Sequence, residues 1–189
     1  MKRRIFKSKK FPIYNYSTKI KNQSISRDII ERPNVAAIIA VKNNQILVVR
    51  CNRFPNGVDI EIPSGNIEKG EKPIKTAFRE FREETGYVAK KMVPFLKFYT
   101  SIGYSTQTVN CFIAKEFELA GKPKLDSGEF LTVKKLDFNK LLKMILSGKI
   151  IDSITISAVL TYALKKKLVH LLVSLIQTLR RHLFSFSSS

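Results

Sequence analysis

One stretch of the chain, residues 65–87 (GNIEKGEKPIKTAFREFREETGY), constrains the fold and the chemistry more than any other. Pro73 suits the first turn of a helix, because its ring fixes φ and it has no N–H to leave unpaired there. Gly86 suits the end of the same helix. Between them, apolar positions recur at intervals of three and four residues, which is typical of a helix that packs one face into a core. These positions are Ile74, Ala77, Phe78, Phe81 and Thr85.

The rest of this helix is crowded with carboxylates. Glu80, Glu83 and Glu84 follow one another closely, Glu71 precedes the helix, and Arg79 is placed to pair with Glu83 at i,i+4. Acids this close repel one another unless a cation offsets their charge. Mg²⁺ prefers carboxylate oxygens and commonly bridges to the phosphates of a substrate. The alternative is a solvated acidic face, which is what most such acidic runs are.

The spacing of the residues decides between these interpretations. They match the pattern G-x5-E-x7-R-E-U-x-E-E-x-G-U, in which U is apolar, at every fixed position. At odds of roughly one in fifteen for each identity, this is not a chance match. The chain therefore resembles the Nudix hydrolases, whose signature this motif is. The matching residues are Gly65, Glu71, Arg79, Glu80, Glu83, Glu84 and Gly86, with Phe81 and Tyr87 at the apolar positions.

The resemblance implies an α/β fold, the Nudix-type α/β/α sandwich with a mixed β-sheet between helices. It also implies that Glu80, Glu83, Glu84 and the backbone carbonyl of Ser64 hold Mg²⁺ or Mn²⁺. Glu83 and Glu84 are the expected catalytic carboxylates, and Arg79 is expected to position Glu83.

Outside the motif, the chain is most similar to the ADP-ribose pyrophosphatase group of that superfamily. That group has Q-Y-R followed by E-L-P-A-G, and this chain has CNR at residues 51–53 and EIPSG at residues 61–65. Arg53 is therefore a candidate phosphate contact, although the glutamine and the tyrosine are absent. Ser64 stands where relatives have an alanine, and a backbone carbonyl ligand survives that exchange.

Two later loops extend the comparison. Residues 100–105 (TSIGYS) stand where relatives carry an S-P-G loop, which makes Ser101 and Gly103 candidate substrate contacts. The proline of that loop is replaced by Ile102, and an ordinary hairpin turn is the alternative. Glu129, in the loop 122–130, matches a glutamate that moves into the site of relatives as a base or a metal ligand. The alternative is a plain loop acid.

We expect three parts along the chain: an N-terminal β extension (1–32), a Nudix domain (33–165) and a C-terminal extension (166–189). The first is basic and is predicted to form one or two strands. Relatives that cleave ADP-ribose often exchange a similar sheet between the subunits of a dimer. We therefore expect a homodimer in which Arg27 reaches the partner subunit's substrate, unless Arg27 is a surface residue of an edge strand.

The C-terminal extension is predicted to be a basic and apolar helix followed by a disordered Ser/Phe tail. Its apolar stretch is shorter than the ~20 residues that cross a bilayer. Basic residues at both ends suit a helix lying on an anionic membrane. A helix packed on a dimer partner, or a prolonged core helix, is the alternative.

Charge and cysteine usage limit the partners and the compartment. The formal net charge is +19, from 34 Lys and Arg against 15 Asp and Glu. This charge suits polyphosphate substrates, nucleic acid or an anionic membrane. Nucleic acid is not favoured, because no array of basic and aromatic residues stands out. Cys51 and Cys111 lie in apolar runs without a CxxC spacing, so we expect buried free thiols and a cytoplasmic protein.

These observations together predict a metal-dependent pyrophosphohydrolase. Its expected substrate is ADP-ribose or a related nucleoside diphosphate derivative, cleaved to AMP and ribose 5-phosphate. Two alternatives stay open. One is a hydrolase of damaged nucleotides or capped RNA, which the net charge would suit. The other is a Nudix-like module that senses a nucleotide without cleaving it, against which the intact set of acids counts.

Overall fold

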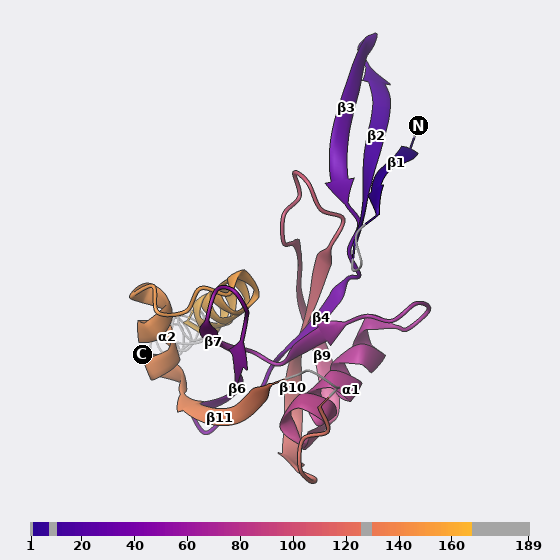
Figure 1. Cartoon of the computed structure of the whole chain (residues 1–189). Helices are drawn as coiled ribbons and strands as arrows, with labels where there is room; N and C mark the ends of the chain where they lie inside the picture. The colour runs from indigo at the N-terminus through magenta and orange to yellow at the C-terminus, as the bar shows by residue number, and fades with distance from the viewer. Residues whose placement is uncertain (1, 8–10, 126–129, 168–189) are drawn as a thin grey trace, which may run out of the picture.

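The structure is a computed structural model that describes residues 2–7, 11–125 and 130–167 of the chain. The strands within these described residues form three sheets. The N-terminal sheet has the order β1-β2-β3, with β1 (Lys2–Lys7), β2 (Pro12–Ile20) and β3 (Gln23–Ile30) all antiparallel. It projects away from the rest of the molecule (Figure 1).

The remaining two sheets form the body of the protein. One has the order β8-β4-β10-β9, in which β4 and β10 are parallel and the other pairs antiparallel, so the sheet is mixed. The other has the order β11-β6-β5, with β7 also paired to β6. Their strands are β4 (Val35–Ile39), β5 (Val41–Lys42), β6 (Gln45–Asn52), β7 (Val58–Glu61), β8 (Ser64–Asn66), β9 (Tyr87–Tyr99), β10 (Thr108–Leu119) and β11 (Leu131–Asp137).

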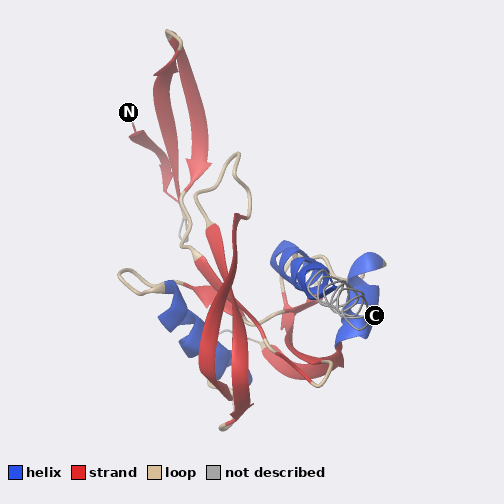
Figure 2. Cartoon of the chain, turned by 180° about the vertical axis from the view of Figure 1, so that it is seen from behind, coloured by secondary structure: helices blue, strands red, loops and turns tan. Residues whose placement is uncertain are grey.

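Helices cover these sheets on two sides. On one side lies α1 (Pro73–Thr85), and on the other lie α2 (Phe138–Leu146) and a helix over residues 153–167 (Figures 1 and 2). The expected Nudix-type α/β/α sandwich is therefore confirmed. Within the described residues, no helix is long and apolar enough to cross a membrane. Residues 168–189, which hold most of the expected C-terminal extension, lie outside the described part of the chain.

Strand β4 lies between two hydrophobic cores and contributes to both. All its side chains are buried, as expected of a strand covered on both faces. Alternate residues point to opposite faces, so Ala36 and Ile38 pack with Ala77 and Phe81 of α1. The odd-numbered residues of β4 join the second core, which α2 and the 153–167 helix close. Strand β4 thus contributes side chains to both cores.

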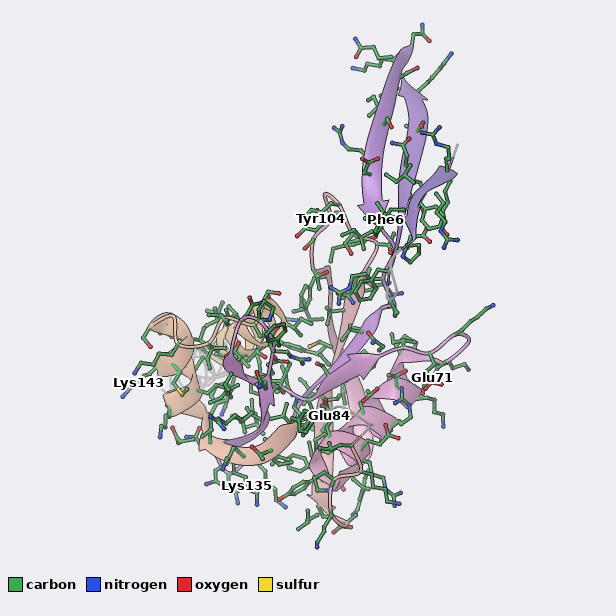
Figure 3. The ribbon with its side chains drawn as sticks, in the orientation of Figure 1. Phe6, Glu71, Glu84, Tyr104, Lys135 and Lys143 are labelled. Atoms are coloured by element: carbon green, nitrogen blue, oxygen red, sulfur yellow. The ribbon has the colours of Figure 1, made fainter. Side chains whose placement is uncertain are left out.

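The N-terminal sheet has three strands, one more than the largest number expected from the sequence. It meets the body at the loop between β9 and β10: Ile30 N–H donates to the carbonyl of Tyr104 (2.8 Å), and Thr106 N–H donates to the carbonyl of Ile30 (3.1 Å). Phe6 and Tyr104 lie on either side of this junction (Figure 3). The two cysteines are buried free thiols, as expected, and burial raises the pKa of each to about 12.

Gly86, which follows α1, carries a testable requirement for stability. It adopts φ 72°, and a Cβ added there would lie 2.2 Å from the carbonyl oxygen of Gly121. We expect Gly86→Ala to lower the free energy of unfolding by about 2 kcal/mol or more, because a left-handed backbone and a backbone clash add up. Urea unfolding measures this loss.

Gly148→Ala is the matched control for this substitution. Gly148 has φ 71°, but a Cβ added there meets nothing within 4 Å. Only the cost of the left-handed conformation remains, about 1 kcal/mol. Equal losses for the two variants would show that the contact between Gly86 and Gly121 contributes nothing.

Candidate active site

Arg79 is the centre of the acidic cluster on α1. Its Nη1 donates to Glu80 Oε1 (2.8 Å) and to Glu83 Oε2 (2.9 Å). Its Nε and Nη2 donate to the two carboxylate oxygens of Glu71 (3.2 and 3.1 Å), and Nη2 also donates to the carbonyl of Asn66 (3.2 Å). The i,i+4 pair with Glu83 that the sequence predicted is confirmed. The pairs with Glu71 and Glu80 were not predicted, and together these hydrogen bonds raise the pKa of Arg79.

Glu84 connects α1 to β8 through a hydrogen bond. Its Oε2 accepts a hydrogen bond from the backbone N–H of Ser64 (2.9 Å), and the residue is only 6% exposed. On the other side of this backbone, Ile38 N–H donates to the carbonyl of Pro63 (2.8 Å). The chain at Pro63 and Ser64 is therefore held between α1 and β4.

Gly65 allows the carboxylate of Glu80 to lie against the backbone. A Cβ added to Gly65 would lie 1.9 Å from Cδ and 2.0 Å from Oε1 of Glu80. Glu80 therefore takes the space that any side chain at position 65 would need. This contact places its oxygens beside the backbone of β8, where Ser64 also lies.

Arg53 and Glu61 form a second charged pair. The Nε and Nη2 of Arg53 donate to the two oxygens of Glu61 (2.7 and 2.5 Å), a bidentate arrangement. Glu61 is 6% exposed, whereas more than half of the Arg53 side chain is exposed. The hydrogen bonds to Glu61 raise the pKa of Arg53. The sequence singled out Arg53, but its pairing with Glu61 appears only in the structure.

Three predicted substrate contacts lie apart from this cluster within one chain. Arg27 is on β3 of the projecting sheet, where its guanidinium donates to the carbonyl of Ser26 (3.2 Å). Ser101 and Gly103 lie in the loop that contacts the base of that sheet; the carbonyl of Ser101 accepts from Tyr104 N–H (3.1 Å). Figure 3 shows the separation, with Tyr104 beside the projecting sheet and Glu84 in the body. Glu129 lies outside the described residues.

The donor atoms at α1 suit a hard divalent cation. Carboxylate and carbonyl oxygens are the ligands that Mg²⁺ and Mn²⁺ take in proteins, and Gly65 gives Glu80 room beside the backbone. Among the described residues, no three Asp, Glu, His or Cys side chains lie in an arrangement that could hold a metal ion. Glu80 and Glu83 instead face Arg79. Binding a cation there would require their carboxylates to turn from the guanidinium.

Glu71 is expected to give the protein a pH-dependent share of its stability. The hydrogen bonds from Arg79 lower the pKa of Glu71 from 4.5 to about 2. Because the folded pKa is the lower one, this stabilisation is complete well above pH 4.5 and is lost as the pH falls toward 2. We expect Glu71→Gln to be less stable than wild type at pH 7, by a difference that shrinks from pH 5 to pH 3. Urea unfolding at these pH values measures it, and a difference independent of pH would contradict the assignment.

The fold and the cluster together define a class of hydrolase that acts on pyrophosphate bonds. The profile of the NUDIX domain family matches residues 31–153. An ADP-ribose pyrophosphatase of Bacillus subtilis is 37% identical over 171 residues, which cover 88% of this chain and 92% of that protein. The chain belongs to the Nudix family and is a Nudix hydrolase.

The chain is also similar to a second curated protein and to a solved structure. A methanol dehydrogenase activator of Bacillus methanolicus is 36% identical over 151 residues, which cover 78% of this chain and 82% of that protein. A crystal structure described as an ADP compounds hydrolase superimposes with a TM-score of 0.77 at 16% identity, over 88% of this chain and 92% of the other. At that identity the superposition supports the fold alone.

Proposed function

We propose that this Nudix hydrolase is a metal-dependent pyrophosphohydrolase of ADP-ribose, or of a related nucleoside diphosphate derivative. The observation that carries the proposal is the placement of the three carboxylates of α1. Glu80 lies against Gly65, Glu84 accepts from Ser64 N–H, and Arg79 joins Glu80 to Glu83. The similarity to the Bacillus subtilis ADP-ribose pyrophosphatase, which extends over most of the chain, supports this choice of substrate.

The residues take the following roles in this proposal. Glu80, Glu83, Glu84 and the carbonyl of Ser64 hold Mg²⁺ or Mn²⁺. A cation held there would neutralise charge on the diphosphate and would lower the pKa of a water molecule. Arg79 holds the carboxylates of Glu80 and Glu83 before a cation binds, and these carboxylates would turn from Arg79 toward the cation.

The reaction is hydrolysis of the phosphoric anhydride. The oxygen of a water molecule bonds to one phosphorus while the bond from that phosphorus to the bridging oxygen breaks. The bridging oxygen leaves with the other phosphate, and the water's proton passes to a carboxylate, for which we propose Glu83 or Glu84, with Glu129 as a further candidate. The products from ADP-ribose are AMP and ribose 5-phosphate.

Arg53 is proposed to contact the substrate's phosphates. Its side chain is more than half exposed, and its guanidinium is oriented by the buried Glu61. The net charge of +19 would raise the rate at which a polyphosphate approaches the protein.

We further propose that a second copy completes the site. The projecting sheet carries half-buried Tyr14, Tyr16 and Ile25 on one face, where Arg27 lines a hollow of about 460 Å³. A face of this kind is suited to a protein partner. In a homodimer, Arg27, Ser101 and Gly103 would reach the substrate bound to the partner subunit.

The test is phosphate release, after a coupled phosphatase, from a panel of substrates with Mg²⁺ or Mn²⁺. The panel holds ADP-ribose, GDP-mannose, NADH, diadenosine polyphosphates, 8-oxoguanine nucleotides and capped RNA. Preference for ADP-ribose, abolished by a chelator, is the expected result. Preference for 8-oxoguanine nucleotides or capped RNA would overturn the substrate, and inactivity across the panel would favour a nucleotide-sensing module.

A further inference from the structure

The backbone that leads into the site is held by hydrogen bonds to residues far along the chain. Residues 59–64 run from β7 into β8 and supply Glu61 and Ser64. On one side this 59–64 segment is held by β4 and α1, through Pro63 and Ser64. On the other side it meets the first turn of the helix over residues 153–167, far along the chain.

Thr155 makes the first of these distant contacts. Its Oγ1 accepts a hydrogen bond from the backbone N–H of Ile62 (3.0 Å) and donates to Asp152 Oδ2 (2.7 Å). Thr155 is fully buried and Ile62 is 1% exposed. Water is therefore kept from replacing this contact, and an unpaired N–H there would be costly. One hydroxyl thus orders the residue that follows Glu61 in the chain.

Asp59 makes the second contact. Its Oδ2 accepts from the backbone N–H groups of Ile151 (3.2 Å) and Asp152 (2.8 Å), and Asp59 is 5% exposed. Asp152 in turn accepts from the N–H of Thr155 (2.7 Å). The start of the 153–167 helix and the 59–64 segment are therefore joined by a connected set of hydrogen bonds, of which the one between Ile62 and Thr155 is buried.

We infer that Thr155 and Asp59 are positioning residues for the metal site. The hydrogen bonds described above join them to the 59–64 segment and to the start of the 153–167 helix. Thr155 fixes the backbone at Ile62, and Asp59 fixes the start of the same segment. The position of the Ser64 carbonyl and the contact of Gly65 with Glu80 depend on the course of this backbone. Replacing a group that orients metal ligands without touching the metal typically weakens metal binding by 10- to 100-fold. The inference rests on the proposed function, because it requires that the site binds a divalent cation.

Two substitutions of Thr155 test this positioning role, and they differ in whether the hydroxyl is kept. Thr155→Val removes the acceptor for Ile62 N–H and nearly keeps the shape, whereas Thr155→Ser keeps the hydroxyl. Thr161→Val is the matched control: Thr161 lies on the same helix, and its hydroxyl donates only to the carbonyl of Ser157 (2.7 Å). Asp59→Asn weakens the second contact independently. Oδ1 of Asp59 accepts from Ile60 N–H (2.8 Å) and Oδ2 accepts from the N–H groups of residues 151 and 152, so in either orientation the amide N–H₂ would face a backbone N–H.

The readout is Mn²⁺ binding to the full chain without substrate, measured from the EPR signal of free Mn²⁺ at a temperature where circular dichroism shows each variant folded. We expect Thr155→Val to raise the dissociation constant for Mn²⁺ about tenfold. Asp59→Asn should shift it in the same direction, while Thr155→Ser and Thr161→Val stay near wild type. A purely structural role for Thr155 would lower the melting temperature and leave the Mn²⁺ affinity of the folded protein unchanged.

The outcomes separate the two proposals. If wild type binds Mn²⁺ and folded Thr155→Val binds it equally well, the positioning role is overturned and the proposed function stands. An equal loss in Thr161→Val would also overturn it. If Thr155→Val does not fold, unchanged binding by Asp59→Asn would overturn it instead. If wild type itself binds no Mn²⁺, the proposed function fails.

Discussion

Replacing Glu84 with glutamine is expected to lower kcat for ADP-ribose by roughly two to three orders of magnitude. Glutamine keeps the volume of the side chain, and its amide oxygen still accepts the hydrogen bond from Ser64 N–H that Glu84 now receives. The fold therefore persists. The negative charge that would bind the cation is lost, and hard cations depend on that charge. Steady-state kinetics at saturating Mg²⁺, together with the melting temperature, measure both effects.

Glu118→Gln is the control for the loss of one negative charge. Glu118 is exposed on β10 and lies outside the acidic cluster. This variant should keep wild-type kinetics, which would exclude a general effect of net charge on the approach of a polyphosphate. Near-normal turnover by a folded Glu84→Gln variant would remove Glu84 from the metal site. A collapse of its melting temperature would instead assign Glu84 to the fold.

The sequence predicted α1 closely because its signals are local. Pro73 marks the first turn, Gly86 marks the end, and the apolar spacing between them identifies the buried face. The structure has the helix at Pro73–Thr85 and Gly86 at φ 72°. Each of these signals acts within one helical turn, so no knowledge of the tertiary structure was needed.

The N-terminal sheet was predicted less well for a physical reason. The turn between β2 and β3 is Lys21-Asn22, with φ of 48° and 65°, and it contains no glycine. Lysine carries no turn signal, and both strands are mainly polar, so the period-two pattern is weak. The sequence indicated strands there, and only the structure separates three of them.

The hydrogen-bond partners of the site residues were the hardest feature to predict from the sequence. The pairing of Arg79 with Glu83 follows from helical spacing, but its hydrogen bonds to Glu71 depend on how the preceding loop folds back. The contact between Ile62 and Thr155 joins residues 93 apart. Thr155 belongs to no motif, so nothing in the sequence distinguishes it from Thr161 on the same helix.

Gly65→Ala is expected to lower kcat for ADP-ribose by about 100-fold with little change in stability. The added Cβ would lie 1.9 Å from Cδ of Glu80, and the end of a flexible side chain yields more easily than backbone does. Glu80 must therefore move by an ångström or more, and a misplacement of that size costs about 100-fold in rate. Gly121→Ala is the control, since a Cβ added at Gly121 meets nothing within 4 Å.

Combining Gly65→Ala with Glu80→Gln tests whether the alanine acts through Glu80. If it acts only by displacing that carboxylate, the substitution should cost little in an enzyme whose Glu80 charge is already gone. The two losses in kcat would then be far from additive, as expected of residues in contact. Additive losses would show that Gly65 acts by another route, such as the backbone of β8 itself. Normal kinetics in Gly65→Ala would mean that Glu80 reaches the cation from another rotamer, and that the glycine of the motif serves only the turn.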